Sequence, residues 1–477
     1  MNKPLLITIG ASTLMFAGCT AKNGESTNPN IIFILADDMG YGDIRYLNSD
    51  SKIPTPNLDR LCSEGMSFTD AHSGSAVSTP TRYGILTGRY CFRSRLKQGV
   101  LYGYDKPLIE RDRPTVASIL KEKNYHTACV GKWHLGLGWR AVDASLPIES
   151  GNVDFRQKVD FSPNDTGFDY SYIIPASLDM APYVYLENGS VVDPRIIITE
   201  RVYTERGVIW RGGEASQSFS FEGCFDHLFE KARQFIIGRQ KEKQPFFLYF
   251  PLTAPHTPWM PAERFNGISG AGKYGDFVAH VDFVVGQIMA TLDSLGLSDN
   301  TMIVFTSDNG ADWKPGDKAQ FPHLANYIFR GQKSDAWEGG HHIPFIVKYP
   351  GKVVPRSSSG ALICLTDFLA TCAEITGANL PETAEDSKSF FGALKGSGKA
   401  RDEIIHHTID GRFAVRKGDW KLVDCSGSGG WSAKEDPALP PVQLYNMKDD
   451  PVESINLYDQ FPEKVEELKK CMDAIIH

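Results

Sequence analysis

The sequence predicts an α/β protein in which a sheet lies between helices, followed by a smaller C-terminal α+β subdomain. Short apolar runs alternate with amphipathic segments from residue 30 to about residue 377. Most of the apolar runs end in polar residues and glycine, as buried strands do where they open onto loops. After residue 377 this alternation stops. The chain has 477 residues, a length that suggests one large domain and a smaller one.

The N-terminus has the pattern of a bacterial lipoprotein signal. Lys3 precedes an apolar run over residues 5–16, and the segment FAGC that ends at Cys19 resembles a lipobox. We expect a signal peptide over residues 1–18, lipidation of the Cys19 sulfur, and a polar tether over residues 19–29. An ordinary signal peptide with an incidental cysteine is the alternative. The protein is expected in the periplasm or at the cell surface, anchored to the outer membrane through its lipid only.

The predicted catalytic domain covers residues 30–385 and is built from alternating elements. Its first strand is the apolar run NIIFILA, which ends at Asp37 and Asp38. A short helix after Ser78 has Pro80 in its first turn, and a long helix ends at Gly296. The other predicted elements are helices within residues 55–66, 115–125, 226–240 and 365–377, and strands within residues 126–136, 244–256, 300–312 and 343–351.

The predicted C-terminal subdomain covers residues 386–477. Residues 378–403 have a linker-like composition, residues 406–424 resemble strands joined at the turn KGD, and residues 462–476 have the pattern of a helix.

Charge and cysteine usage exclude some classes of function. The formal net charge of −8 argues against nucleic-acid binding, so an anionic ligand would need a local cluster of bases. Beyond Cys19 there are eight cysteines and no CxxC pair, which argues against a structural zinc site and favours buried thiols.

Polar residues gather where the predicted strands end. Because open α/β sheets bind ligands at the carboxyl ends of their strands, we expect these residues to meet at one edge. A subset of them offers only hard oxygen ligands, which suit Ca²⁺, and Mg²⁺ less well, rather than zinc. The predicted metal ligands from the strand ends are Asp37, Asp38, Asp308 and Asn309, and the other strand-end residues are Lys132, His134 and His256.

The segment STPTR, with Ser78, Pro80 and Arg82, resembles the sulfatase signature C/S-x-P-x-R, and TGR follows at residues 87–89. GKWHLG at residues 131–136 resembles the second signature of that family. ADDMGYGD, TPNLDRL, PHTPW, TSDNG, WEGG and LYNMKDDPVESINL follow the family's order as well. The resemblance covers nearly the whole chain after residue 29 and implies an alkaline-phosphatase-like fold, in which a mixed sheet lies between helices.

The resemblance also implies that Ser78 is the precursor of formylglycine, which contributes to the metal site. A serine at this position implies maturation by a radical enzyme. The structural alternative for Ser78 is a helix N-cap.

The family mechanism then assigns roles to the charged residues. A hydroxyl of the formylglycine hydrate attacks sulfur, Lys132 and the metal draw charge from the sulfate, and Arg82 holds the hydrate. His134 removes a proton so that sulfate can leave. Lys333 or His256 protonates the departing sugar oxygen.

The implied activity is hydrolysis of sulfate monoesters on carbohydrates by an exo-acting enzyme. The substrate implied by overall similarity is a 6-O-sulfated galactose or N-acetylgalactosamine, bound through Lys333, His256 and Asp179. One alternative is a phosphatase or phosphonate monoester hydrolase on the same fold. A second is a surface glycan-binding protein without catalysis, in which Ser78 stays unmodified.

Overall fold

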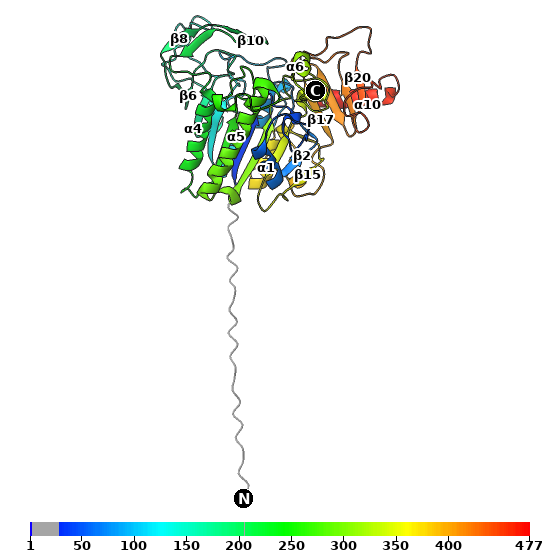
Figure 1. Cartoon of the computed structure of the whole chain (residues 1–477), viewed down its shortest axis with the longest axis horizontal. Coiled ribbons are helices and arrows are strands. Elements are labelled where there is room, and N and C mark those ends of the chain that lie inside the picture. Colours follow the sequence, from blue (N-terminus) through cyan, green and yellow to red (C-terminus); the bar gives the residue numbers. More distant parts are fainter. Residues whose placement is uncertain (2–27, 205) are drawn as a thin grey trace.

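The computed structural model describes residues 1, 28–204 and 206–477 and contains a central ten-stranded mixed sheet (Figure 1). The predicted signal peptide, Cys19 and most of the predicted tether lie outside the described residues. Four neighbouring strands in the middle of the sheet, β13, β1, β12 and β4, run parallel to one another. The strands lie in the order β15 (Ser357–Ser359), β2 (Met66–Phe68), β14 (Phe345–Lys348), β13 (Thr301–Ser307), β1 (Asn30–Ala36), β12 (Phe246–Pro251), β4 (His126–Lys132), β5 (Tyr170–Ile174), β6 (Leu186–Glu187) and β7 (Ser190–Val191).

Helices cover both faces of this sheet, as predicted. Successive side chains of a strand point to opposite faces, so Ile31 and Phe33 of β1 pack into one apolar cluster and Ile32 and Ile34 into the other. The first cluster includes α2 (Ser78–Thr87), α3 (Val116–Glu122) and α8 (Phe368–Thr376). The second includes α1 (Pro56–Glu64), α4 (Cys224–Gly238) and α5 (Gly272–Leu295).

Helix α5 has the length and apolar character of a membrane span, alone among the helices that the structure describes. It is mostly buried and contacts α1 and α4. These contacts make it a core helix of the main domain.

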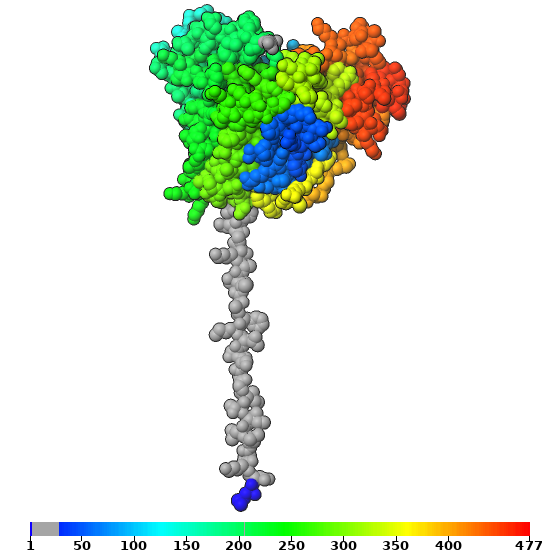
Figure 2. All heavy atoms as spheres, in the orientation of Figure 1, coloured from blue at the N-terminus to red at the C-terminus, as the bar shows by residue number. Residues whose placement is uncertain are grey.

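A second sheet follows near the C-terminus, in agreement with the predicted α+β subdomain. It is antiparallel and consists of β17 (Glu403–His407), β18 (Phe413–Lys417), β19 (Trp420–Val423) and β20 (Gln443–Asn446). Helix α10 (Pro462–Ile476) contacts β18 and β19. Figure 2 shows this part, in orange and red, packed against one end of the main body. The boundary between residues 385 and 386 stays a prediction.

Several short elements, of two to six residues, were not predicted, because so few residues do not show a clear periodicity. They include two small hairpins, β8 (Ile196–Thr199) with β11 (Gly213–Ser216), and β9 (Val202–Thr204) with β10 (Gly207–Trp210). The other unpredicted elements are the sheet strands β2, β5, β6, β7, β15 and β20, the strands β3 (Ala71–His72) and β16 (Ile363–Cys364), the helices α6 (Pro315–Gln320), α7 (Glu338–His341) and α9 (Phe391–Leu394), and the 3-10 turns Tyr41–Asp43, Cys91–Arg93, Pro163–Thr166, Glu263–Phe265, Ser298–Asn300 and Leu365–Asp367.

Candidate active site

The carboxyl ends of four adjacent parallel strands bring the predicted polar residues together. Asp37 and Asp38 follow β1, Lys132 ends β4, and Asp308 follows β13. His256 lies five residues beyond the end of β12. These strands are adjacent and parallel, so their carboxyl ends lie at the same edge of the sheet. The prediction that the polar residues gather at one edge is confirmed.

Ser78 is the first residue of α2 and is buried at this edge. The preceding Val77 has an extended backbone. Pro80 occupies the third helical position, in the first turn, where its missing N–H leaves no helical hydrogen bond unmade. The Ser78 Oγ lies 3.4 Å from Asp37 Oδ1. The serine therefore faces the Asp37 carboxylate at the end of β1, and the backbone N–H groups of the first turn of α2 lie beside it.

Arg82, one turn after Ser78, joins two of the carboxylates. Its Nη2 lies 2.8 Å from Asp308 Oδ2 and 3.3 Å from Asp37 Oδ1, and its Nη1 donates to the Lys132 carbonyl oxygen at 3.1 Å. Lys132 Nζ donates to Asp37 Oδ2 at 2.7 Å. All four side chains are fully buried. Buried ions need such pairing, because each charge loses its hydration.

Asp38 is the centre of a second set of contacts. Lys333 Nζ lies 2.7 Å from Asp38 Oδ2, and His256 Nε2 lies 3.7 Å from the same oxygen. Asn309 Nδ2 donates to Asp38 Oδ1 at 2.7 Å. The structure thus brings together Lys333 and His256, which the sequence analysis named as candidate proton donors.

At this edge of the sheet, the pKa values of Lys132 and Lys333 shift in opposite directions. Burial lowers the pKa of Lys132, although Asp37 opposes this effect. Burial also opposes protonation of Lys333, but Asp38 and Asp37 outweigh it and raise the Lys333 pKa above its usual range. Burial, with Asp37 beside it, raises the pKa of Asp308 to about 6. Three carboxylates this close together favour a cation among them.

His134 occupies a strained position just beyond β4. Its φ of 56° is in the left-handed region, and its Nε2 lies 2.7 Å from the Leu101 carbonyl oxygen. The buried Nδ1 has no hydrogen-bond partner in the described part of the chain. Burial, with Lys132 and Arg82 nearby, holds the His134 pKa well below its usual range. The ring is therefore neutral at neutral pH and able to accept a proton.

The predicted metal ligands fit a hard cation. Asp37, Asp38 and His256 have ligand atoms within 4.8 Å of one another. The buried Asn309 Oδ1 has no hydrogen-bond partner among the described residues, so one amide oxygen is free for an ion. Carboxylate and amide oxygens are the donors that Ca²⁺ and Mg²⁺ prefer.

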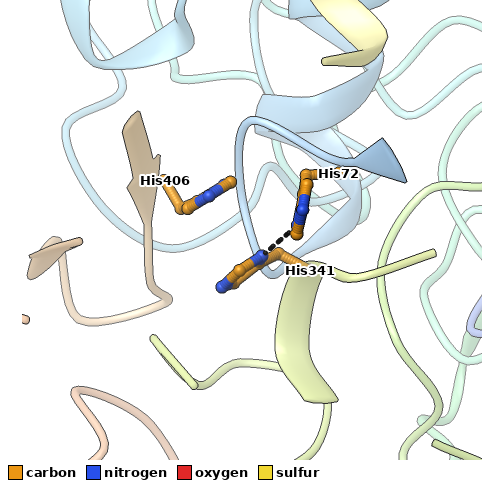
Figure 3. A group of neighbouring side chains, drawn as sticks. All are labelled: His72, His341 and His406. Atoms are coloured by element: carbon orange, nitrogen blue, oxygen red, sulfur yellow. Dashed lines mark hydrogen bonds between the residues drawn. The ribbon is translucent and has the colours of Figure 1, made fainter. Parts of the chain in front are cut away.

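A second group of histidines, His72, His341 and His406, fits a metal poorly (Figure 3). His72 and His341 already share a hydrogen bond between their Nδ1 atoms, 3.0 Å apart. The His341 and His406 rings are stacked, with centroids 3.7 Å apart and planes 11° apart. Imidazole lone pairs lie in the ring plane, so two parallel rings do not point at one ion. This group joins α7 and β17, on either side of the subdomain interface.

The match to known proteins decides the family. The family model described as Sulfatase matches residues 29–378. The chain belongs to the sulfatase family. It is therefore a sulfuric ester hydrolase with the sulfatase fold, in agreement with the sequence analysis. The chain is 35% identical to an N-acetylgalactosamine-6-O-sulfatase of Bacteroides thetaiotaomicron over 99% of both chains, and 29% identical to human arylsulfatase A over 94% of this chain and 87% of that one.

This sulfatase also resembles a solved structure from work on the metabolism of multiple glycosaminoglycans by Bacteroides thetaiotaomicron. The TM-score is 0.83 at 34% identity, covering 94% of this chain and all of the other. The match extends through the C-terminal subdomain, beyond the residues that the family model covers.

The ion pair that Asp179 forms involves none of the charged residues around Ser78. The Asp179 Oδ2 forms an ion pair with Arg211 Nη1 at 3.0 Å. Ser177, two residues earlier, lies 3.4 Å from His256 Nδ1. A role for Asp179 in sugar binding stays a prediction.

Trp431, an exposed tryptophan of the C-terminal subdomain, was not among the predicted site residues. Lys333 Nζ lies 5.9 Å from the centre of its ring. The Trp431 backbone N–H donates to Ser334 Oγ, which fixes the loop against the segment that contains Lys333. The only local signal was a tryptophan inside the polar stretch SGSGGWS.

Proposed function

We propose that this sulfatase removes sulfate monoesters from glycans and that Ser78 is converted to formylglycine. The observation that supports this most directly is the place of the Ser78 Oγ, 3.4 Å from Asp37 at a buried helix start. Formylglycine, once formed and hydrated, supplies a hydroxyl that attacks sulfur and a second one that allows sulfate to leave.

The residues around position 78 are suited to an anionic substrate. Lys333 stays protonated at neutral pH because Asp38 and Asp37 stabilise its charge despite burial, and it can donate a hydrogen bond to a sulfate oxygen. Arg82 and Lys132 hold Asp37 in place from two sides. Preorganised charges of this kind stabilise the charge that develops in the transition state.

Two proton transfers are assigned to side chains of this edge. The neutral His134, whose Nδ1 has no hydrogen-bond partner among the described residues, acts as the base for the nucleophilic residue. His256 or Lys333 donates a proton to the departing sugar oxygen, since both lie against Asp38.

Ca²⁺ is the proposed ion, with Mg²⁺ as the weaker candidate. Asp37, Asp38, Asp308 and Asn309 would hold it together with the modified residue 78. The Asn309 Oδ1, which has no hydrogen-bond partner in the described part of the chain, supports this assignment. When bound, the ion neutralises charge on the sulfate oxygens.

The proposed substrate is a 6-O-sulfated galactose or N-acetylgalactosamine at a chain end. The activity named for the Bacteroides thetaiotaomicron relative supports this choice. The Trp431 ring beside Lys333 offers an apolar face on which a sugar ring can pack. Family membership favours this activity over a phosphatase, and the complete buried set of charges argues against a protein that only binds glycans.

We further propose a periplasmic or surface location through a lipid on Cys19, and maturation of Ser78 by a radical enzyme. The sequence around each residue supports these two proposals.

One experiment tests the nucleophile and the substrate together. The protein is produced with and without the maturing enzyme, the tryptic peptide of residue 78 is weighed, and sulfate release is measured from 6-O-sulfated and 4-O-sulfated N-acetylgalactosamine. Loss of mass at Ser78 together with 6-O-selective release supports the proposal. Full activity of the protein with unmodified Ser78 would contradict it.

A second experiment separates the two candidate proton donors. The residue that protonates the leaving oxygen matters most for a poor leaving group, so its alanine variant should lose far more activity on a sugar sulfate than on 4-nitrophenyl sulfate. K333A and H256A are compared on both substrates. An equal loss on both substrates, in both variants, would remove the proposed role.

A further inference from the structure

A cavity of about 760 Å³ lies beside the candidate active site. Its walls come from the β9–β10 hairpin, the segment after β12, the start of α5 and the region of α6. Trp259 and Phe321 provide aromatic surface, and Lys273 and Lys314 provide positive charge. None of these residues is among the predicted catalytic or metal-binding residues.

Two connections join this cavity to the reacting groups. On one side, Thr257 lines the cavity and directly follows His256 in the chain. Trp259 packs against Tyr274 with ring centres 5.7 Å apart, and the Tyr274 hydroxyl oxygen lies 3.2 Å from the Asp38 carbonyl oxygen. The cavity therefore lies next to the segment that carries His256, one of the two candidate proton donors.

On the other side the link is Asp312, four residues after Asp308. It lies 3.9 Å from Lys314 Nζ and 3.5 Å from Arg206 Nη1. The residue before Asp312, Ala311, accepts a hydrogen bond at 3.1 Å from the Lys333 backbone N–H through its carbonyl oxygen. The segment that carries Asp312 thus connects the lining of the cavity, through Lys314, to the segment that carries Lys333.

The basic groups of the cavity differ in how far they are already paired. Arg206 is occupied, because it pairs with Asp317 and stacks over Trp259 with its guanidinium carbon 3.9 Å from the ring centre. Lys314 is exposed, and within the residues that the structure describes its one ion pair is the 3.9 Å contact with Asp312. Lys273 is exposed and has no ion pair within residues 28–204 and 206–477. Two ammonium groups are therefore available to an anion from solution.

We propose that this cavity binds the sugar next to the one that loses sulfate, and that this neighbouring sugar is acidic. Lys273 and Lys314 bind its carboxylate or sulfate, and Trp259 and Phe321 pack against its ring. This inference rests on the proposed glycan sulfatase function and extends it, because it makes an acidic oligosaccharide the preferred substrate.

The test compares three disaccharides that all begin with a 6-O-sulfated N-acetylgalactosamine. The second sugar is a hexuronate, a sulfated hexose or a neutral hexose, and kcat/KM is measured with matured enzyme. We expect at least a fivefold preference for an acidic over the neutral disaccharide, because a partly exposed ion pair contributes about a factor of five. The preference should shrink in 0.5 M NaCl.

The double variant K273A/K314A should lose this preference and keep the wild-type rate on the neutral disaccharide. The control K241A/K243A removes two exposed lysines outside the cavity and should behave as wild type. Equal rates on all three disaccharides, or a preference that survives in K273A/K314A, would overturn the inference. Failure of the wild-type enzyme to release sulfate from any of them would instead overturn the proposed function.

Discussion

Replacing Arg82 with methionine tests the charge network beneath Ser78. Methionine keeps much of the side-chain length but removes the guanidinium, which is fully buried and contacts Asp308 at 2.8 Å and Asp37 at 3.3 Å. Asp308 then loses its closest cation. Breaking a buried ion pair from one side costs about 3–5 kcal/mol.

The expected loss can be measured as a shift in the unfolding temperature. Unfolding entropy scales with chain length, so a folded chain of this size has an entropy of roughly 1 kcal/mol/K and R82M should lose roughly 3–5 °C in Tm. Activity should fall at least tenfold, because Arg82 also holds Asp37 near Ser78. Differential scanning calorimetry in EDTA and in Ca²⁺ measures the shift in Tm, and an assay of sulfate release measures the loss of activity.

The matched control is R89M, just beyond the same helix. The Arg89 side chain is 19% exposed and pairs with Glu385 at 2.7 Å near the surface, where an ion pair is worth about 0–1 kcal/mol. Added Ca²⁺ should restore more stability to R82M than to R89M, since the ion replaces the lost charge. A Tm for R82M within a degree of that for R89M would refute the argument that Asp308 depends on this arginine.

Three further predictions concern other parts of the molecule. K421M should lower the free energy of unfolding by about 3–5 kcal/mol, because Lys421 is buried between Glu338 and Glu453 at 2.9 and 2.7 Å. Urea unfolding measures this loss, with K464M as the control, since Lys464 pairs with Glu467 at the surface. Equal unfolding midpoints for the two variants would disprove the prediction. W431A should raise KM for a sugar sulfate about three- to tenfold with little change in kcat. W431F should bring KM back close to the wild-type value. An unchanged KM in W431A would exclude the sugar contact. Stability should decrease as pH falls from about 6.5 toward 4. Burial lowers the pKa of His407 to about 4 and the pKa values of His341 and His406 well below the usual range, so only the unfolded chain takes up these protons. Each such histidine adds a slope of up to about 1.4 kcal/mol per pH unit to the free energy of unfolding, and a flat stability profile between these pH values would show that the rings are not held neutral.

The sequence by itself determined the repeated strand–helix pattern, the polar strand ends and the start of a helix at Ser78. These features are local, because they depend on apolar runs, turn residues and spacing within a few positions. The small hairpins around residues 196–216 were missed, since strands of three or four residues carry too little pattern.

Only the tertiary structure decided which charge pairs with which. Lys333 and Asp38 are 295 residues apart in the chain, yet their side chains lie 2.7 Å from each other. Trp431 reaches Lys333 from a different subdomain through a backbone hydrogen bond to Ser334. Such contacts depend on how strands and loops pack in space, and no short-range pattern in the chain encodes their geometry.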